Sequence, residues 1–285
     1  MGYNIKSFVQ SEFVSGFKKS MRPNWSFSFR FDELPCFLAW PLVFLLSFTK
    51  ITPNQVAFVS FLSGMGFLVA LFLDYLALYP LPMFGLLAAR IVLDCVDGQL
   101  ARYTNKTSNL GALYDLMSDF IFAIGLFLCL GYVLIVHQET ASDMVIPTAS
   151  VALFCFLTSS TAFSYISALE RSSGLYPSEV RRRFVGRLEN DRPESAFYGF
   201  KLAVFNLLFR YSWRIISYFS FLLVVNPEKS DLHASALGIL SPLEFGMHLA
   251  VLAIIILFQV NLVYFLIFEI IAFCALFLVL LYHYR

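Results

Sequence analysis

Residues 78–136 read LYPLPMFGLLAARIVLDCVDGQLARYTNKTSNLGALYDLMSDFIFAIGLFLCLGYVLIV. Two apolar runs, 78–98 and 111–136, carry four aspartates at their facing ends: Asp94, Asp97, Asp115 and Asp119. A helix that crosses a bilayer needs about 20 mostly apolar residues, so both runs are predicted to span a membrane. Charged groups in such helices face a protein interior or a water-filled cavity. This stretch therefore predicts two membrane helices that meet at a polar site.

The composition of the whole chain agrees with a membrane protein. Among its 285 residues, 59% are hydrophobic and 14% are charged, whereas about a quarter are charged in a typical soluble domain. The mean hydropathy is +0.74. We therefore expect an all-α, polytopic integral membrane protein. Because 20 basic residues balance 19 acidic ones, no electrostatic track for nucleic acid is expected.

The apolar runs predict six core transmembrane helices. They lie near residues 53–74, 78–98, 111–136, 145–169, 201–225 and 243–282. The last run fits either one tilted helix or two short helices broken near Gln259 and Asn261. A shorter apolar run, 34–48, predicts a helix that lies along the membrane surface. We expect one membrane domain, 34–285, preceded by an N-terminal arm, 1–33.

Positive charges predict the orientation of the chain. Lysine and arginine collect on the cytoplasmic side of membrane proteins, and an arginine-rich segment follows the fourth predicted span. The loop near 137–144 has no Lys or Arg. The arm, the arginine-rich segment and the loop that is predicted to hold Arg102 and Lys106 should therefore face the cytoplasm. The expected location is a bacterial cytoplasmic membrane.

The four aspartates predict a metal site. Spacings of three and four place each pair on one face of its helix, so four carboxylates should converge. Their mutual repulsion would be relieved by one or two divalent cations, and all-oxygen ligands suit Mg²⁺ or Mn²⁺. Two such ions can clamp a phosphoryl group during displacement. Arg90, four residues before Asp94, is interpreted as a partner of that acid.

Small residues beside the acids complete a recognisable pattern. The pattern is Asp94-x-x-Asp97-Gly98-x-x-Ala101-Arg102, eight further residues, then Gly111-x-x-x-Asp115-x-x-x-Asp119. It resembles the signature of the CDP-alcohol phosphotransferase family, and Thr52-Pro53-Asn54 resembles the usual start of that family's first span.

The resemblance implies transfer of a phosphoryl-alcohol unit from a CDP-linked donor to a second alcohol, with release of CMP. It implies that Asp94, Asp97 and Asp115 bind two metal ions, and that Asp119 binds metal and acts as general base. The nucleotide pocket would comprise Gly98, Ala101, Arg102, Gly111 and Asn54. A homodimer is also expected by resemblance.

The two substrates are harder to predict. We expect CDP-diacylglycerol as donor and a small polar alcohol, with or without a phosphate group, as acceptor. Basic side chains after the fourth span are candidate acceptor contacts: Arg181, Arg182, Arg183 and Arg192. The alternative donors are CDP-choline and CDP-ethanolamine, with diacylglycerol as acceptor. A cation transporter and an inactive scaffold are rival interpretations of the acids.

The remaining polar and sulfur-containing residues are expected to be structural. The cysteines form no C-x-x-C pair and are interpreted as small apolar residues; they are Cys36, Cys95, Cys129, Cys155 and Cys274. Glu269 lies inside the last apolar run and is expected to pair with another polar group. His248 is expected at the membrane interface.

Overall fold

The computed structural model describes residues 5–21, 34–74, 78–136, 142–171 and 245–284. Within these ranges every regular element is an α-helix, which confirms the predicted all-α class for this part of the chain. The helices are α1 (Ile5–Ser20), α2 (Leu34–Ser47), α3 (Pro53–Phe72), α4 (Pro80–Tyr103), α5 (Asn109–Val136), α6 (Ser142–Arg171), α10 (Phe245–Leu257) and α11 (Val263–Tyr284).

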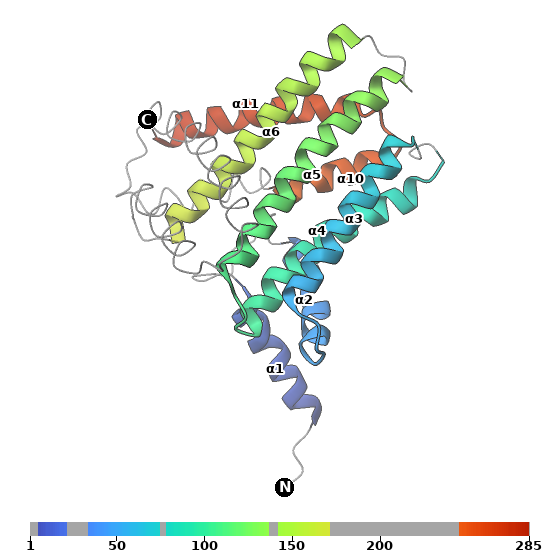
Figure 1. The fold of residues 1–285 in the computed structure, drawn as a ribbon. Helices are drawn as coiled ribbons and strands as arrows, with labels where there is room; N and C mark the ends of the chain where they lie inside the picture. Colours follow the sequence, from blue (N-terminus) through green and yellow to red (C-terminus); the bar gives the residue numbers. More distant parts are fainter. Residues whose placement is uncertain (1–4, 22–33, 75–77, 137–141, 172–244, 285) are drawn as a thin grey trace, which may run out of the picture.

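Helix α3 packs against both α4 and α5, and the three run side by side in the same oblique direction in Figure 1. Its start is fixed by local chemistry. The Thr52 hydroxyl accepts a hydrogen bond from the Gln55 amide, and the Gln55 side chain accepts one from the Thr52 amide. This capping box, with Pro53 at the first helical position, satisfies amide groups that a helix start leaves unpaired. Asn54 is thereby held at the end of α3 nearest the acids.

Helix α4 runs further than its apolar residues predict. The predicted span ends at residue 98, whereas α4 continues to Tyr103 and ends at Thr104, whose amide bonds to the Leu100 carbonyl. The prediction that Arg102 lies in the following loop is therefore wrong, since it lies in the last helical turn. The backbone hydrogen bonds of the helix continue past residue 98, where the apolar run ends. Asn105, with a φ of 54°, then turns the chain toward α5.

The core lies between α3, α4, α5, α6, α10 and α11. Small residues let the helices approach closely, as is common in membrane bundles. A Cβ at Gly125 of α5 would lie 2.7 Å from Leu68 Cδ1 of α3, and one at Gly64 would lie 2.9 Å from the Phe122 ring. Many apolar side chains point outward instead, among them Leu128 at 69% exposure, as expected for a surface that faces lipid.

Three stretches among the described residues are long and apolar enough to cross a membrane: Pro53–Phe72, Met117–Val136 and Ser142–Ser159. Shorter apolar helices accompany them, so the described part supports a membrane protein. Helix α4 carries Arg90, Asp94 and Asp97 within its apolar run, which lowers its hydropathy. The predicted span 201–225 lies outside the described residues, and the count of six spans stays a prediction.

The final apolar run, 243–282, forms two helices. Helix α10 ends at Leu257 and α11 begins at Val263, with Gln259 at a φ of 53° between them. Of the two sequence-based alternatives, the broken form is therefore correct. Inside this pair the His248 Nδ1 and Glu269 Oε2 atoms are 2.7 Å apart, and both side chains are fully buried. The polar partner predicted for Glu269 is thus His248, which lies in the first turn of α10 with its side chain buried in the protein. Its predicted position at the membrane interface stays a prediction.

Candidate phosphotransfer site

Three of the four signature acids meet at one end of the bundle. Asp94 and Asp97 come from α4, and Asp115 comes from α5. One carboxylate oxygen of each lies within 4.8 Å of the others. Asp97 is nearly buried, whereas Asp94 and Asp115 are partly exposed. The spacing of the acids on two separate helices therefore brings three carboxylates to one small volume.

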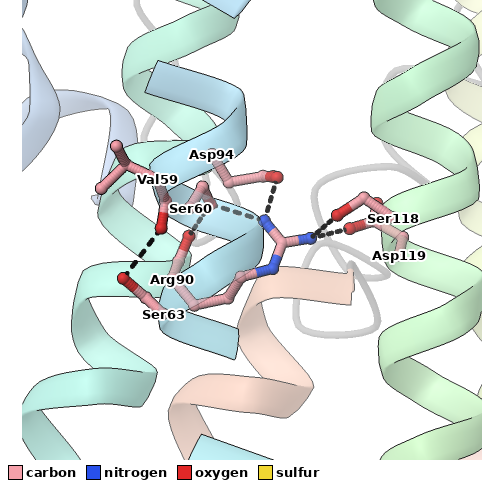
Figure 2. Close-up of polar contacts among 7 residues, drawn as sticks. All are labelled: Val59, Ser60, Ser63, Arg90, Asp94, Ser118 and Asp119. Carbon is pink, nitrogen blue, oxygen red and sulfur yellow. Dashed lines mark hydrogen bonds and ion pairs between the residues drawn. The ribbon is translucent and has the colours of Figure 1, made fainter. Parts of the chain in front are cut away.

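The fourth acid, Asp119, is joined to this group through Arg90. The Arg90 guanidinium donates to Asp94 Oδ1 through Nη1 and to Asp119 Oδ1 through Nη2. Figure 2 shows the guanidinium between Asp94 on one side and Ser118 and Asp119 on the other. The pairing with Asp94 was expected from the sequence. The pairing with Asp119 was not, because its only sequence signal was an arginine within an apolar run.

The surroundings of Arg90 explain how a cation is accommodated in the bundle. Its side chain is 1% exposed. Nη1 also donates to the Ser60 hydroxyl at 2.8 Å, and that hydroxyl donates to the Arg90 carbonyl at 3.0 Å. Gly64 leaves room for the arginine stem, because a Cβ there would lie 3.2 Å from Arg90 Cδ. The guanidinium carbon lies 5.9 Å from the centre of the Phe122 ring. Small and polar residues of α3 thus hold the arginine that links α4 to α5.

The charges of this cluster fit a divalent cation. Four carboxylates and one guanidinium sum to a charge of −3 when all are ionised. One divalent ion would leave −1, and two would leave +1. A set made only of carboxylate oxygens is the donor set that hard ions such as Mg²⁺ and Mn²⁺ prefer. Asp94, Asp97 and Asp115 are therefore the residues that could hold a metal.

A cavity of about 200 Å³ opens beside the acids. Its walls include all five residues that the sequence assigned to a nucleotide pocket: Asn54, Gly98, Ala101, Arg102 and Gly111. Asp97 and Asp115 also line it, which connects the cavity to the metal cluster. The structure therefore brings the predicted pocket residues of three helices together against two of the predicted metal ligands.

The cavity has further walls that the sequence analysis did not assign, namely Pro53, Ala57, Lys106, Thr107 and Ser108. Lys106 adds a positive charge from the turn between α4 and α5. The Ser108 hydroxyl accepts a hydrogen bond from the Gly111 amide at 3.0 Å. The sequence could have suggested this part of the wall, because a lysine and two hydroxyl residues lie between the two halves of the signature.

The glycines of the signature leave space inside the cavity. A Cβ at Gly98 would lie 3.2 Å from Arg102 Nη1, and a Cβ at Gly111 would lie 3.0 Å from the Ser108 hydroxyl oxygen. The first glycine thus lets the Arg102 guanidinium lie along α4. The second lets the Ser108 hydroxyl lie close against the first turn of α5, where it accepts from the Gly111 amide.

Comparison with known protein families gives a match. Residues 50–187 match the model of the CDP-alcohol phosphatidyltransferase family. The match confirms, over those residues, the resemblance drawn from the signature. It supports a transferase with a phosphatidyl-transfer role in phospholipid synthesis, using a CDP-alcohol donor and an alcohol acceptor. Divalent metal use is a known property of the family. No curated protein and no solved structure matches the chain.

The predicted acceptor contacts lie outside the described residues. This holds for Arg181, Arg182, Arg183 and Arg192. Their role stays a prediction.

Proposed function

We propose that the protein transfers a phosphatidyl group from CDP-diacylglycerol to a small polar alcohol and releases CMP. The observation that carries this proposal is one cavity that joins the five predicted nucleotide residues to two acids of the carboxylate cluster. A cavity with both a nucleobase-sized space and a metal cluster suits a nucleotide-linked phosphate better than a bare ion. The family match supports the same choice over a cation transporter.

The pocket residues would bind the cytidine end of the donor. Gly98, Ala101 and Gly111 offer little side-chain bulk, so a flat base can lie against the helices. Arg102 and Lys106 would contact phosphate oxygens, for which a guanidinium is well suited. Asn54 would add a hydrogen bond from α3. Each of these contacts positions the diphosphate toward the acids.

Asp94, Asp97 and Asp115 would hold one or two divalent ions, with Asp119 as a further ligand. When bound, the metal would neutralise negative charge on the diphosphate and on the displaced CMP. Phosphoryl transfer depends mainly on such positioning and charge stabilisation. Asp119 would take the proton of the acceptor hydroxyl as its oxygen attacks the phosphorus that bears the lipid. The bond from that phosphorus to the CMP oxygen then breaks. Arg90, which donates to Asp119, would set the direction of this carboxylate.

The membrane arrangement follows from the same site. We place the acids at the cytoplasmic ends of α4 and α5. These two helices belong to a bundle of six spans, which a surface helix precedes. A lipid-linked donor would then enter sideways from the bilayer, and a polar acceptor would enter from the cytoplasm. The arginines after α6 would contact a phosphorylated acceptor. A homodimer is part of the proposal through the family alone.

The test is CMP release by the purified protein in lipid nanodiscs with Mg²⁺ or Mn²⁺. CDP-diacylglycerol, CDP-choline and CDP-ethanolamine are each combined with a panel of acceptors, diacylglycerol included. Asp119→Asn should abolish release and leave CMP binding largely intact, because a base is lost but three metal ligands remain. Asp143→Asn, an exposed acid at the start of α6, is the matched control and should behave as the parent.

Release that requires CDP-choline or CDP-ethanolamine would move the protein to the alternative branch of substrates. Near-normal release by Asp119→Asn would remove that residue from the role of base. Absence of release for every pair, together with metal flux across the membrane, would favour the transporter.

A further inference from the structure

Helix α1 lies outside residues 50–187, the part that matches the family, yet it packs against α2 and α4. Figure 1 shows it at the end of the bundle where α2 and the end of α4 lie. Its inward residues follow the helical period: Phe13, Gly16, Phe17 and Ser20 are buried or half-buried. Lys18 and Lys19, between them, are exposed. Helix α1 therefore has one packed face and one polar face.

Aromatic side chains fix the packed face of α1 on its neighbours. The Phe17 ring stacks on Phe37 with centroids 5.1 Å apart, and Phe13 lies 5.5 Å from Trp40. Trp40 in turn meets Tyr103, the last residue of α4, edge-on at 5.4 Å. The Lys19 ammonium lies 5.5 Å from the centre of the same Tyr103 ring. These contacts hold the end of α1 over the end of α4.

Gly16 sets how closely the two helices approach. A Cβ at this position would lie 2.9 Å from an atom of the Trp40 ring and 2.9 Å from an atom of the Tyr103 ring. Both neighbours are large rings that are themselves packed, so they have little room to move aside. A larger residue here would push α1 away from α4.

The close approach places the end of α1 on Arg102. Arg102 Nε donates to the Ser20 carbonyl at 2.6 Å, and Ser20 is fully buried. The last carbonyls of a helix have no partner within it and form the negative end of its dipole, so a guanidinium satisfies both needs. One step along the chain, Met21 Sδ lies 3.8 Å from Gln99 Nε2, which also donates to the Cys36 carbonyl at 2.8 Å.

We propose that α1 is a positioning element of the nucleotide pocket: its final carbonyl fixes the Arg102 side chain beside Gly98 so that Arg102 can contact the donor's phosphates. This inference rests on the proposed function. It assigns to the arm, through Ser20, a part in donor binding. Without α1 the Arg102 side chain would lose a charge-assisted contact and sample more rotamers, and both changes weaken its hold on a phosphate.

The test displaces α1 without altering any residue that lines the cavity. Gly16→Leu adds bulk against Trp40 and Tyr103. Ser15→Leu adds similar bulk on the exposed face of the same helix and is the matched control. Hydrogen exchange of the α1 amides reports whether the helix is docked. Calorimetry with CMP and Mg²⁺ in nanodiscs reports nucleotide affinity.

Gly16→Leu should raise α1 exchange and weaken CMP binding about tenfold, the scale of one lost charge-assisted hydrogen bond. The KM for the CDP donor should rise by a similar factor while kcat stays within about twofold, and Ser15→Leu should match the parent. In an Arg102→Gln background, Gly16→Leu should have little further effect, because residues that act through one contact are not additive.

Raised α1 exchange with unchanged CMP affinity would overturn the inference. An additive tenfold loss in the Arg102→Gln background would also overturn it. If Gly16→Leu leaves α1 docked, Phe17→Glu, which places a carboxylate among Phe37 and Trp40, is measured in its place against the same criteria. If the parent protein binds no CMP with either metal, the proposed function is overturned, and this inference with it. If a variant with undocked α1 binds CMP as the parent does, the inference alone is rejected.

Discussion

Replacing Arg90 with methionine tests the central feature of the site, a buried guanidinium that joins two acids. Arg90 bonds to Asp94 and Asp119 and is 1% exposed. Methionine matches the apolar stem of arginine and carries no charge, so the substitution keeps the packing of the stem. It leaves two carboxylates without their shared partner. The free energy of unfolding should fall.

The expected size of the loss follows from burial. Removing one member of a buried ion pair costs about 3–5 kcal/mol. The side chains of Asp94 and Asp119 are 31% and 22% exposed, so both can regain some water. The lower end, about 3 kcal/mol, is therefore expected. Equilibrium unfolding in mixed micelles, with the metal removed by a chelator, measures this quantity directly.

Two further variants distinguish charge pairing from packing. Arg90→Lys keeps the charge but lacks the planar fork that reaches two acids, so its loss should be intermediate. Combining Arg90→Met with Asp119→Asn removes both sides of one pair. The double variant should lose at least about 1 kcal/mol less than the sum of the single losses. Additive losses, within about 0.5 kcal/mol, would refute the pairing of Arg90 with Asp119.

For Arg90→Met we expect the opposite effect of metal: bound Mg²⁺ should stabilise this variant more than the parent. Without Arg90 the charge of the cluster changes from −3 to −4 when all four acids are ionised. Mg²⁺ should therefore stabilise Arg90→Met more than it stabilises the parent, although turnover falls because Asp119 loses its orientation. Equal protection of both proteins by Mg²⁺ would mean that the metal is not held by this cluster.

Two more predictions concern contacts outside the cluster of Asp94, Asp97, Asp115 and Asp119. The Sγ atoms of Cys36 and Cys95 are 3.6 Å apart, so oxidation with diamide should join the two residues in a disulfide that peptide mapping detects. Cys129 is the control and should stay a thiol. If Cys36 and Cys95 both remain thiols, the packing of α2 on α4 is contradicted. Glu269→Ala should lower the free energy of unfolding by about 1–3 kcal/mol, because it leaves the buried His248 ring without its partner. Replacing both His248 and Glu269 by leucine should cost less than the two single changes together, and an additive cost would show that the two side chains do not interact.

The grouping of the candidate residues could be predicted because helical spacing fixes which side chains share a face. Asp94 and Asp97 lie three apart, and Gly98 and Arg102 lie four apart. Once these stretches are helical, their side chains must point to one side. The structure accordingly places three acids in one cluster and all five pocket residues around one cavity. Spacing within a helix therefore carried most of the candidate site.

Contacts between distant helices could not be predicted in the same way. The pairing of Arg90 with Asp119 joins α4 to α5, and the contact of Ser20 with Arg102 joins α1 to α4. Neither follows from a period along the chain, because each depends on how two helices cross. The position of Arg102 shows a second limit. Hydropathy ended the span at residue 98, but the hydrogen-bonded helix continues to Tyr103.

The two limits have one physical origin. Apolar length measures how much of a helix can face lipid, whereas Ala101 and Arg102 lie where α4 continues beyond its apolar run. There, backbone hydrogen bonds keep these two residues in helical register with Asp97 and Gly98, and all four line one cavity. Helix α1 supplies a carbonyl at that same end. Hydropathy assigns no role to the N-terminal arm. The contact of its helix α1 with Arg102 can therefore be found only from the three-dimensional structure.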